Sequence, residues 1–193
     1  MSAAPDLRGW LLEEHADVRS RLERQVLGSV PPERRPEQAD GGGSSIDALL
    51  WHVARHQDLA VNGVVRGAPQ VLDRWAARLG APARSAGSGL EEAEQRDVTA
   101  ALDPEVLAGY VLDVFDTTAE WLASVPLGTF EDRPDSAAAL RHAGVTEEDF
   151  RWLHEMWEGK RVAFYVRWEA IGHCLNHVGE MVAVRNRLGL GRF

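Results

Sequence analysis

Apolar residues recur at intervals of three and four over much of the chain, the spacing that places them on one face of an α-helix. The first such stretch is residues 6–27 (DLRGWLLEEHADVRSRLERQVL), in which Asp6 can cap the first turn. The segment that follows, VPPERRPEQADGGG, contains three prolines and three adjacent glycines. Proline removes a backbone donor and glycine weakens regular structure, so we expect a linker or a surface loop here.

Three further long stretches show the same helical spacing: 46–67, 103–125 and 161–188. Pro104 stands at the first helical position of its stretch, where its missing N–H costs no hydrogen bond. Gly189 ends the last stretch, and glycine is the residue that most often follows a helix. The chain therefore predicts four long helices.

Shorter elements are expected between these helices. Residues 69–80 (PQVLDRWAARLG) predict a short helix, and Thr146 with three acidic residues after it predicts a cap for a helix that runs through Trp157. The connections 81–102 and 126–146 show no clear spacing, and we expect loops there, with at most a helical turn in the first. No segment has a strand pattern. The prediction is an all-α single domain spanning residues 1–193, a four-helix bundle with short extra helices and long connecting loops.

Composition narrows the class of protein. Hydrophobic residues make up 45% of the 193 residues and charged residues 26%, which is typical of a globular chain. The net charge of −9 argues against nucleic acid or an anionic membrane as a partner, because either would need a basic face. No apolar run approaches the roughly 18 residues of a membrane span. One cysteine, Cys174, and the lack of a signal-peptide pattern favour a cytoplasmic location.

Four of the seven histidines form two pairs with a spacing of four residues: His52 with His56, and His173 with His177. This spacing stacks side chains on one helical face, so each pair can direct both imidazoles at one metal ion. A catalytic metal needs a third ligand from another helix. Burying several histidines in an apolar bundle is costly unless their polar atoms have partners, and a shared metal would satisfy several at once. The alternative is a set of packed histidines that bond to carbonyl groups.

Two segments, LLWHVARHQDLAVNGVV and IGHCLNHVGEMVAVRNRLGL, resemble the DinB/YfiT-like family of metal-binding four-helix bundles. The resemblance implies that His52, His173 and His177 are the metal ligands, and it places Gly179-Glu180 at the Gly-Gln or Gly-Glu step of the family pattern. It also implies a homodimer. His56 has no general counterpart in that pattern, and it stays the chief alternative to His52 as the third ligand.

The resemblance further implies the chemistry, because characterised relatives include thiol-dependent transferases and a mycothiol-dependent maleylpyruvate isomerase. Zinc or nickel suits three imidazole ligands, and a coordinated thiol loses its proton more easily. The leading hypothesis is therefore a metal-dependent transferase or isomerase that uses mycothiol or a similar low-molecular-weight thiol on a small-molecule substrate. A non-catalytic metal-binding stress protein and a metal-dependent hydrolase are the alternatives.

The sequence also suggests a role for each of the remaining candidate residues. Glu180 could orient a ligand or act as a base, and an exposed helix carboxylate is the plain alternative. Cys174 should be a structural residue, since it projects about 100° round the helix from His173. His15 is expected in the core or at its boundary, and Asp58 is expected to be solvated or to cap a helix. The arginines near the C-terminus are expected to pair with the helix dipole.

Overall fold

The computed structural model describes residues 6–80 and 97–191. Within these two ranges every regular element is helical and no strand occurs, so the predicted all-α class is confirmed. None of the helices in these ranges is long and apolar enough to cross a membrane.

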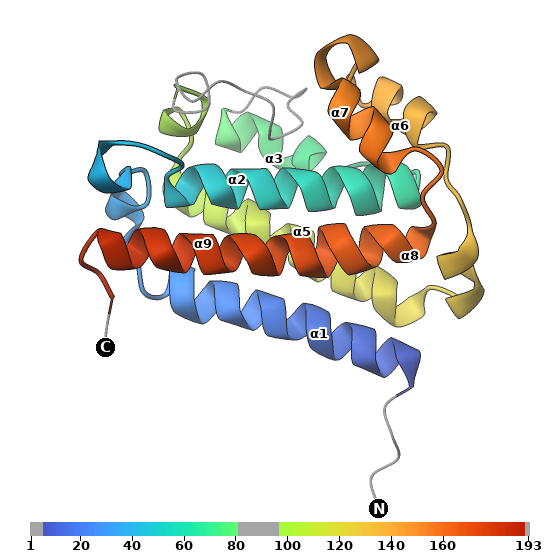
Figure 1. Cartoon of the computed structure of the whole chain (residues 1–193), viewed down its shortest axis with the longest axis horizontal. Coiled ribbons are helices and arrows are strands. Elements are labelled where there is room, and N and C mark those ends of the chain that lie inside the picture. Colours follow the sequence, from blue (N-terminus) through green and yellow to red (C-terminus); the bar gives the residue numbers. More distant parts are fainter. Residues whose placement is uncertain (1–5, 81–96, 192–193) are drawn as a thin grey trace, which may run out of the picture.

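Four long helices form the bundle: α1 (Leu7–Leu22), α2 (Ile46–Gln57), α5 (Pro104–Ser124) and α9 (His173–Arg187). Helix α1 contacts α5 and α9, and α2 contacts the same two helices, so the four form a closed ring around one core. As Figure 1 shows, α1 and α9 run in one direction, whereas α2 and α5 run in the opposite direction. Helices α2 and α9 are therefore antiparallel neighbours.

Three of the predicted helices contain stretches with wider, π-helical turns. Helix α1 continues as η1 (Glu23–Leu27), α2 continues as η4 (Asp58–Val65), and α8 (Val162–Tyr165) passes through η6 (Val166–Gly172) into α9. The predicted stretches 6–27, 46–67 and 161–188 are thus nearly continuous helical runs. Single π-helical turns often lie at functional sites, and here η4 and η6 lie next to two of the paired histidines.

The shorter elements are η2 (Pro32–Arg34), η3 (Ala39–Gly41), α3 (Leu72–Leu79), η5 (Leu127–Glu131), α6 (Ser136–His142) and α7 (Glu147–Trp157). The prediction of a loop over 126–146 is wrong, because η5 and α6 lie there. Asp135 caps α6 by accepting a bond from the N–H of Ala138, and alanine favours the helix. Residues 97–100 form a helical turn, and the rest of the predicted connection, 81–96, lies outside the described residues.

Capping side chains are present at the start of four helices, including the predicted caps Asp6 and Thr146. The side chains of Asp6, Ser45, Asp103 and Thr146 each accept a hydrogen bond from a backbone N–H in the first turn that follows. Such bonds satisfy donors that the helix itself leaves without partners. The starts of α1, α2, α5 and α7 are therefore fixed by local sequence.

Helices α6 and α7 form a second layer beside one end of the bundle (Figure 1). Their apolar side chains pack against η4 in a cluster that contains Leu59, Leu153, Trp157 and Tyr165, all fully buried. The Tyr165 hydroxyl donates to the carbonyl of Trp157 at 3.0 Å. This layer brings two tryptophans of α7 against the π-helical ends of α2 and α9.

Asp58 ties this region together as a fully buried carboxylate. It accepts bonds from the backbone N–H groups of Val71 and Leu72, both at 2.9 Å, and from the hydroxyl of Tyr110 at 3.0 Å. Arg55 lies 3.4 Å away and supplies the opposite charge. Two roles were predicted for Asp58, solvation or helix capping. It caps α3, and its side chain is not solvated.

A second polar network crosses the middle of the bundle. The side-chain amide of Gln57 donates to Thr118 at 2.9 Å and to Nε2 of His15 at 3.1 Å. Its oxygen lies 3.4 Å from Sγ of Cys174. Burial lowers the pKa of His15 from 6.5 to about 4, with a further contribution from the charge of Arg19. His15 is thus a neutral core residue at neutral pH.

This burial predicts a loss of stability on acidification. The unfolded chain binds a proton at His15 below its ordinary pKa of 6.5, whereas the folded chain binds it only near pH 4. The contribution of His15 is therefore complete above pH 6.5 and is lost as the pH falls toward 4. Between pH 7 and pH 5, the free energy of unfolding should fall by about 2 kcal/mol more for the wild type than for His15→Gln.

Urea unfolding in the presence of EDTA measures this difference without a contribution from bound metal. His142→Gln is the matched control, because His142 is exposed at the end of α6 and should leave the pH dependence unchanged. Equal pH dependence in the wild type and His15→Gln would contradict the assignment.

Candidate metal centre

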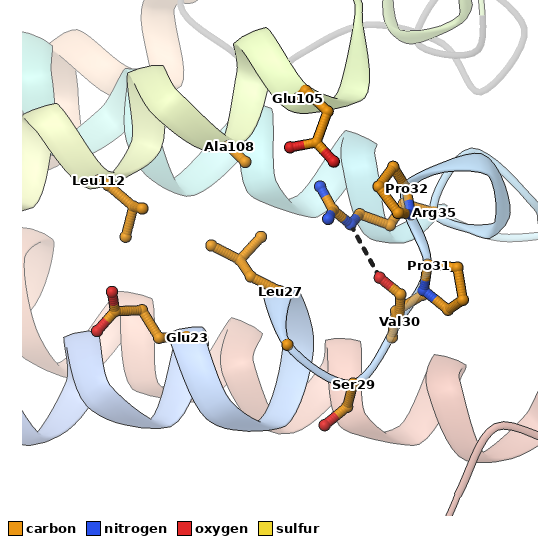
Figure 2. A pocket seen from close by; sticks show the side chains of 11 residues that line it. Glu23, Leu27, Ser29, Val30, Pro31, Pro32, Arg35, Glu105, Ala108 and Leu112 are labelled. Atoms are coloured by element: carbon orange, nitrogen blue, oxygen red, sulfur yellow. Dashed lines mark hydrogen bonds between the residues drawn. The ribbon is translucent and has the colours of Figure 1, made fainter.

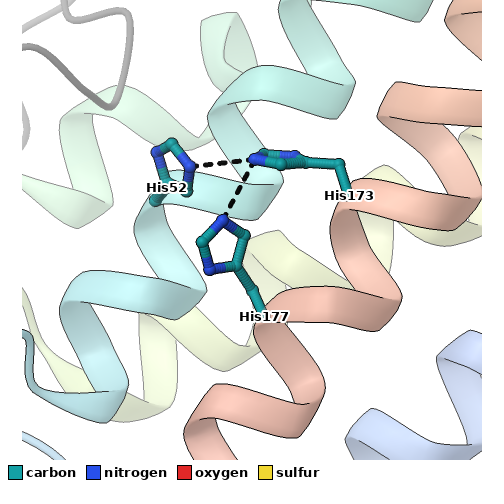
Figure 3. Close-up of side chains that lie close together, drawn as sticks. All are labelled: His52, His173 and His177. Carbon is teal, nitrogen blue, oxygen red and sulfur yellow. Dashed lines mark hydrogen bonds between the residues drawn. The ribbon is translucent and has the colours of Figure 1, made fainter.

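Three histidines from two helices converge on one point between α2 and α9 (Figure 3). Nε2 of His173 lies 3.0 Å from Nε2 of His52 and 3.1 Å from Nε2 of His177. One ligand atom from each of the three residues lies within 4.8 Å of the other two. The structure thus brings together the three ligands that the family pattern implies, and we call them the outer triad.

Local sequence explains this arrangement. His173 and His177 are four residues apart in α9, so their rings lie on one face, with centroids 4.6 Å apart and planes perpendicular to each other. That face is turned toward α2, where the ring of His52 meets both rings edge-on at 4.7–4.8 Å. The antiparallel packing of α2 and α9 supplies the third ligand.

Hydrogen bonding alone accounts poorly for three converging Nε2 atoms. Nε2 of His173 has either one proton or one lone pair, yet it contacts two other ring nitrogens. Ligands bound at 2.0–2.1 Å lie about 3.0 Å apart at right angles and about 3.3 Å apart in a tetrahedron. The observed 3.0 and 3.1 Å are therefore separations expected for nitrogens that share one metal ion.

Electrostatics favour the form of His173 that binds a metal. Burial, together with the neighbouring imidazoles of His56, His52 and His177, lowers its pKa to about 2. The ring is therefore neutral at pH 7. A neutral imidazole keeps a lone pair for a cation, as metal binding requires.

Glu180 lies beside the outer triad and contacts one of its rings. Its Oε2 is 2.8 Å from Nδ1 of His177, on the opposite side of the ring from Nε2. A carboxylate in this place holds the proton on Nδ1 and leaves the Nε2 lone pair directed toward the other two histidines of the outer triad. Of the two predicted roles, the geometry favours orientation of His177 over action as a base.

Glu169 is a residue of the site that sequence reasoning missed. It is fully buried, and its Oε1 accepts a 2.7 Å bond from the indole N–H of Trp157. Its Oε2 lies 3.7 Å from Nδ1 of His173 and 3.5 Å from Nδ1 of His56. Its spacing is the sequence feature that could have identified it, since Glu169, His173 and His177 follow one another at intervals of four residues.

His56, the alternative third ligand, belongs to a different group. Its ring lies 4.6 Å from that of His52 and stacks on Trp152 at 5.9 Å. Its Nδ1 faces Glu169, and His56, Glu169 and His173 form a second group of possible metal ligands. We call this group the inner cluster. His173 belongs to both groups, through Nε2 in the first and Nδ1 in the second.

The other candidates lie apart from the two groups. Cys174 is fully buried, its Sγ contacts Gln57, and burial raises the pKa of its thiol, so it has the structural role predicted for it. Arg185 and Arg187 stand in the last turn of α9, where cations complement the helix dipole. Arg192 lies outside the described residues.

A hollow of about 560 Å³ opens away from these histidines, between the end of η1 and the start of α5 (Figure 2). Glu23 and Glu105 line it, with Arg35 between the proline turn and α5. Arg35 donates to the carbonyls of Val30 and Pro104, both at 3.2 Å, so its guanidinium group holds the loop in place. None of the predicted site residues lines this hollow, and we assign no function to it.

Comparison with known proteins supports the fold. No protein-family model and no curated protein matches this chain. A solved structure, described as a conserved protein from Enterococcus faecalis, matches 96% of this chain and 99% of its own length with a TM-score of 0.71. The sequences are 14% identical, so the likeness shows the fold alone.

The contact between Glu180 and His177 predicts an effect on metal affinity. Glu180→Ala removes the acceptor that orients the ring, and loss of such a partner typically weakens metal binding by about 10- to 100-fold. Competition with a chromophoric chelator measures the Kd for zinc. Glu155→Ala is the control, because Glu155 also forms an ion pair on one helical face, with Arg151, and contacts no histidine ligand. Equal affinities in the two variants would rule out the orienting role.

Proposed function

We propose that this chain is a metal-dependent enzyme that binds zinc or nickel through His52, His173 and His177 and uses a low-molecular-weight thiol. The observation that carries the proposal is that Nε2 of His173 lies 3.0 Å from Nε2 of His52 and 3.1 Å from Nε2 of His177. His52 and His177 are partly exposed, and no fourth His, Cys, Asp or Glu among the described residues joins this group. Three protein ligands and a remaining open position are typical of catalytic metal sites.

The ligand set fits activation of a thiol. When the outer triad alone holds an ion, three neutral imidazoles leave the full charge of a divalent ion available, and this charge would lower the pKa of a thiol that binds at the open position. A thiolate is the reactive form in transfer and isomerisation reactions. The choice of thiol, mycothiol or a similar molecule, rests on the family resemblance of the helices that carry the triad, as does pairing into a homodimer.

The two alternatives make different structural demands. A metal-dependent hydrolase needs a base beside the metal-bound water, and Glu180 instead contacts Nδ1 of His177, on the far side of that ring. A purely structural metal site would have four protein ligands, whereas the outer triad has three among the described residues. These observations favour the thiol-dependent enzyme.

The outer triad predicts a thiol-binding cation. When the protein is loaded with Co²⁺, an added thiol such as mycothiol or cysteine should give a sulfur-to-cobalt charge-transfer band in the near ultraviolet. His52→Ala and His177→Ala each remove one ligand of the ion in the outer triad and should abolish the band. His142→Ala replaces an exposed histidine of α6 and should leave it unchanged.

A band would support the use of a thiol and justify a screen of thiol-linked substrates. If Co²⁺ binds to the wild type but thiols produce no band, the thiol-dependent function is wrong. If the band persists in both alanine variants, the ion does not sit in the outer triad.

A further inference from the structure

The carboxylate of Glu169 lacks the partners that a buried charge requires. Only Oε1 has a hydrogen bond, from Trp157, and Oε2 is buried without one. Among the described residues, no arginine or lysine forms an ion pair with this carboxylate. Nδ1 of His173, which faces it, is also buried without a hydrogen-bond partner. Unpaired buried polar atoms are rare, and each one calls for an explanation such as an absent ion.

The distances in the inner cluster are those of ligands around a cation. Oε2 of Glu169 lies 3.5 Å from Nδ1 of His56 and 3.7 Å from Nδ1 of His173. An N–H···O hydrogen bond would be about 2.7–3.2 Å long, so both contacts are too long for one. Ligands at 2.0–2.2 Å from a metal lie about 3.3–3.8 Å apart for angles between 109° and 120°.

We propose that His56, Glu169 and His173 form a second divalent-cation site, adjacent to the outer triad and joined to it by the ring of His173. Two imidazoles and one carboxylate are a ligand set that zinc takes. The negative charge of Glu169 offsets part of the charge of the ion, which lowers the cost of burying both. This site goes beyond the proposed function, which needs only the outer triad.

The two positions differ in access to solvent and so in the role they can have. All three residues of the inner cluster are buried, whereas two of the outer triad are partly exposed. Trp157 donates to Glu169 and Trp152 stacks on His56, so an ion in the inner cluster would link α7 to α2 and α9. An ion in the inner cluster would therefore be shielded from solvent, and the outer position is the one open to ligands. Filling both positions requires His173 to release its remaining ring proton to solvent.

Metal stoichiometry tests the second site. The full chain is dialysed against zinc buffered by a chelator of micromolar affinity, and bound zinc is measured by mass spectrometry. We expect about two equivalents for the wild type. Glu169→Gln and His56→Phe should each bind one equivalent less, because each removes an inner ligand and keeps the side-chain volume. His142→Ala should bind as much as the wild type.

Circular dichroism checks that the variants are folded. The number of zinc ions bound by the wild type tests the second site even if a variant fails to fold. No bound zinc in the wild type, one equivalent that Glu169→Gln keeps, or two equivalents in Glu169→Gln would overturn the second site. The outer triad is tested separately, because His52→Ala should lose one equivalent and keep the inner ion. If the wild type binds one ion that depends on Glu169 and not on His52, the inner site stands alone and the proposed function fails.

Discussion

Burial of imidazole rings along the contact between α2 and α9 is the constraint on which the rest of the structure depends. Every ring nitrogen in an apolar interior needs a partner, and this bundle meets the need in two ways. On one side of α2, Gln57 gives His15 a hydrogen bond and completes a neutral network. On the neighbouring side, three Nε2 atoms converge, and hydrogen bonds between them cannot satisfy all three rings. A cation would satisfy them together, so the packing of the two helices creates a group of side chains that could hold a metal ion.

The second layer of the fold determines which ring nitrogens face which partners. Asp58 holds the start of α3 against η4, and the apolar cluster around Trp157 fixes α6 and α7 on the same segment. Trp157 in turn holds Glu169 behind His173. The indole that holds Glu169 thus comes from α7, a part of the chain that the four-helix ring does not need. The fold likeness at 14% identity covers the ring and this layer, but it does not reach the side chains that would bind a metal.

Sequence spacing predicted the elements whose signal is local. The long helices, their caps and the four-residue spacing of His173 and His177 all depend on residues within a few turns of one another. Helix α6 was missed because seven residues are too short to show a stripe. The π-helical turns could not be predicted from the spacing of apolar residues. Glu169 was missed because its role depends on an indole that reaches it only when α7 folds back, and the direction of His56 depends on the same contact. That the triad binds a metal and acts on a thiol stays a prediction.

The single cysteine explains why a thiol, if the site uses one, has to come from another molecule. Cys174 is the next residue after His173, and it is the chain's one cysteine. Its thiol lies in the bundle interior, with Sγ 3.4 Å from Gln57 and 3.2 Å from the carbonyl of Glu169, and burial raises its pKa. A thiol in this setting stays protonated and inert. Two of the three histidines of the outer triad, in contrast, are partly exposed. A thiolate at such a site would therefore have to enter from outside, as an enzyme that uses a diffusible thiol would require.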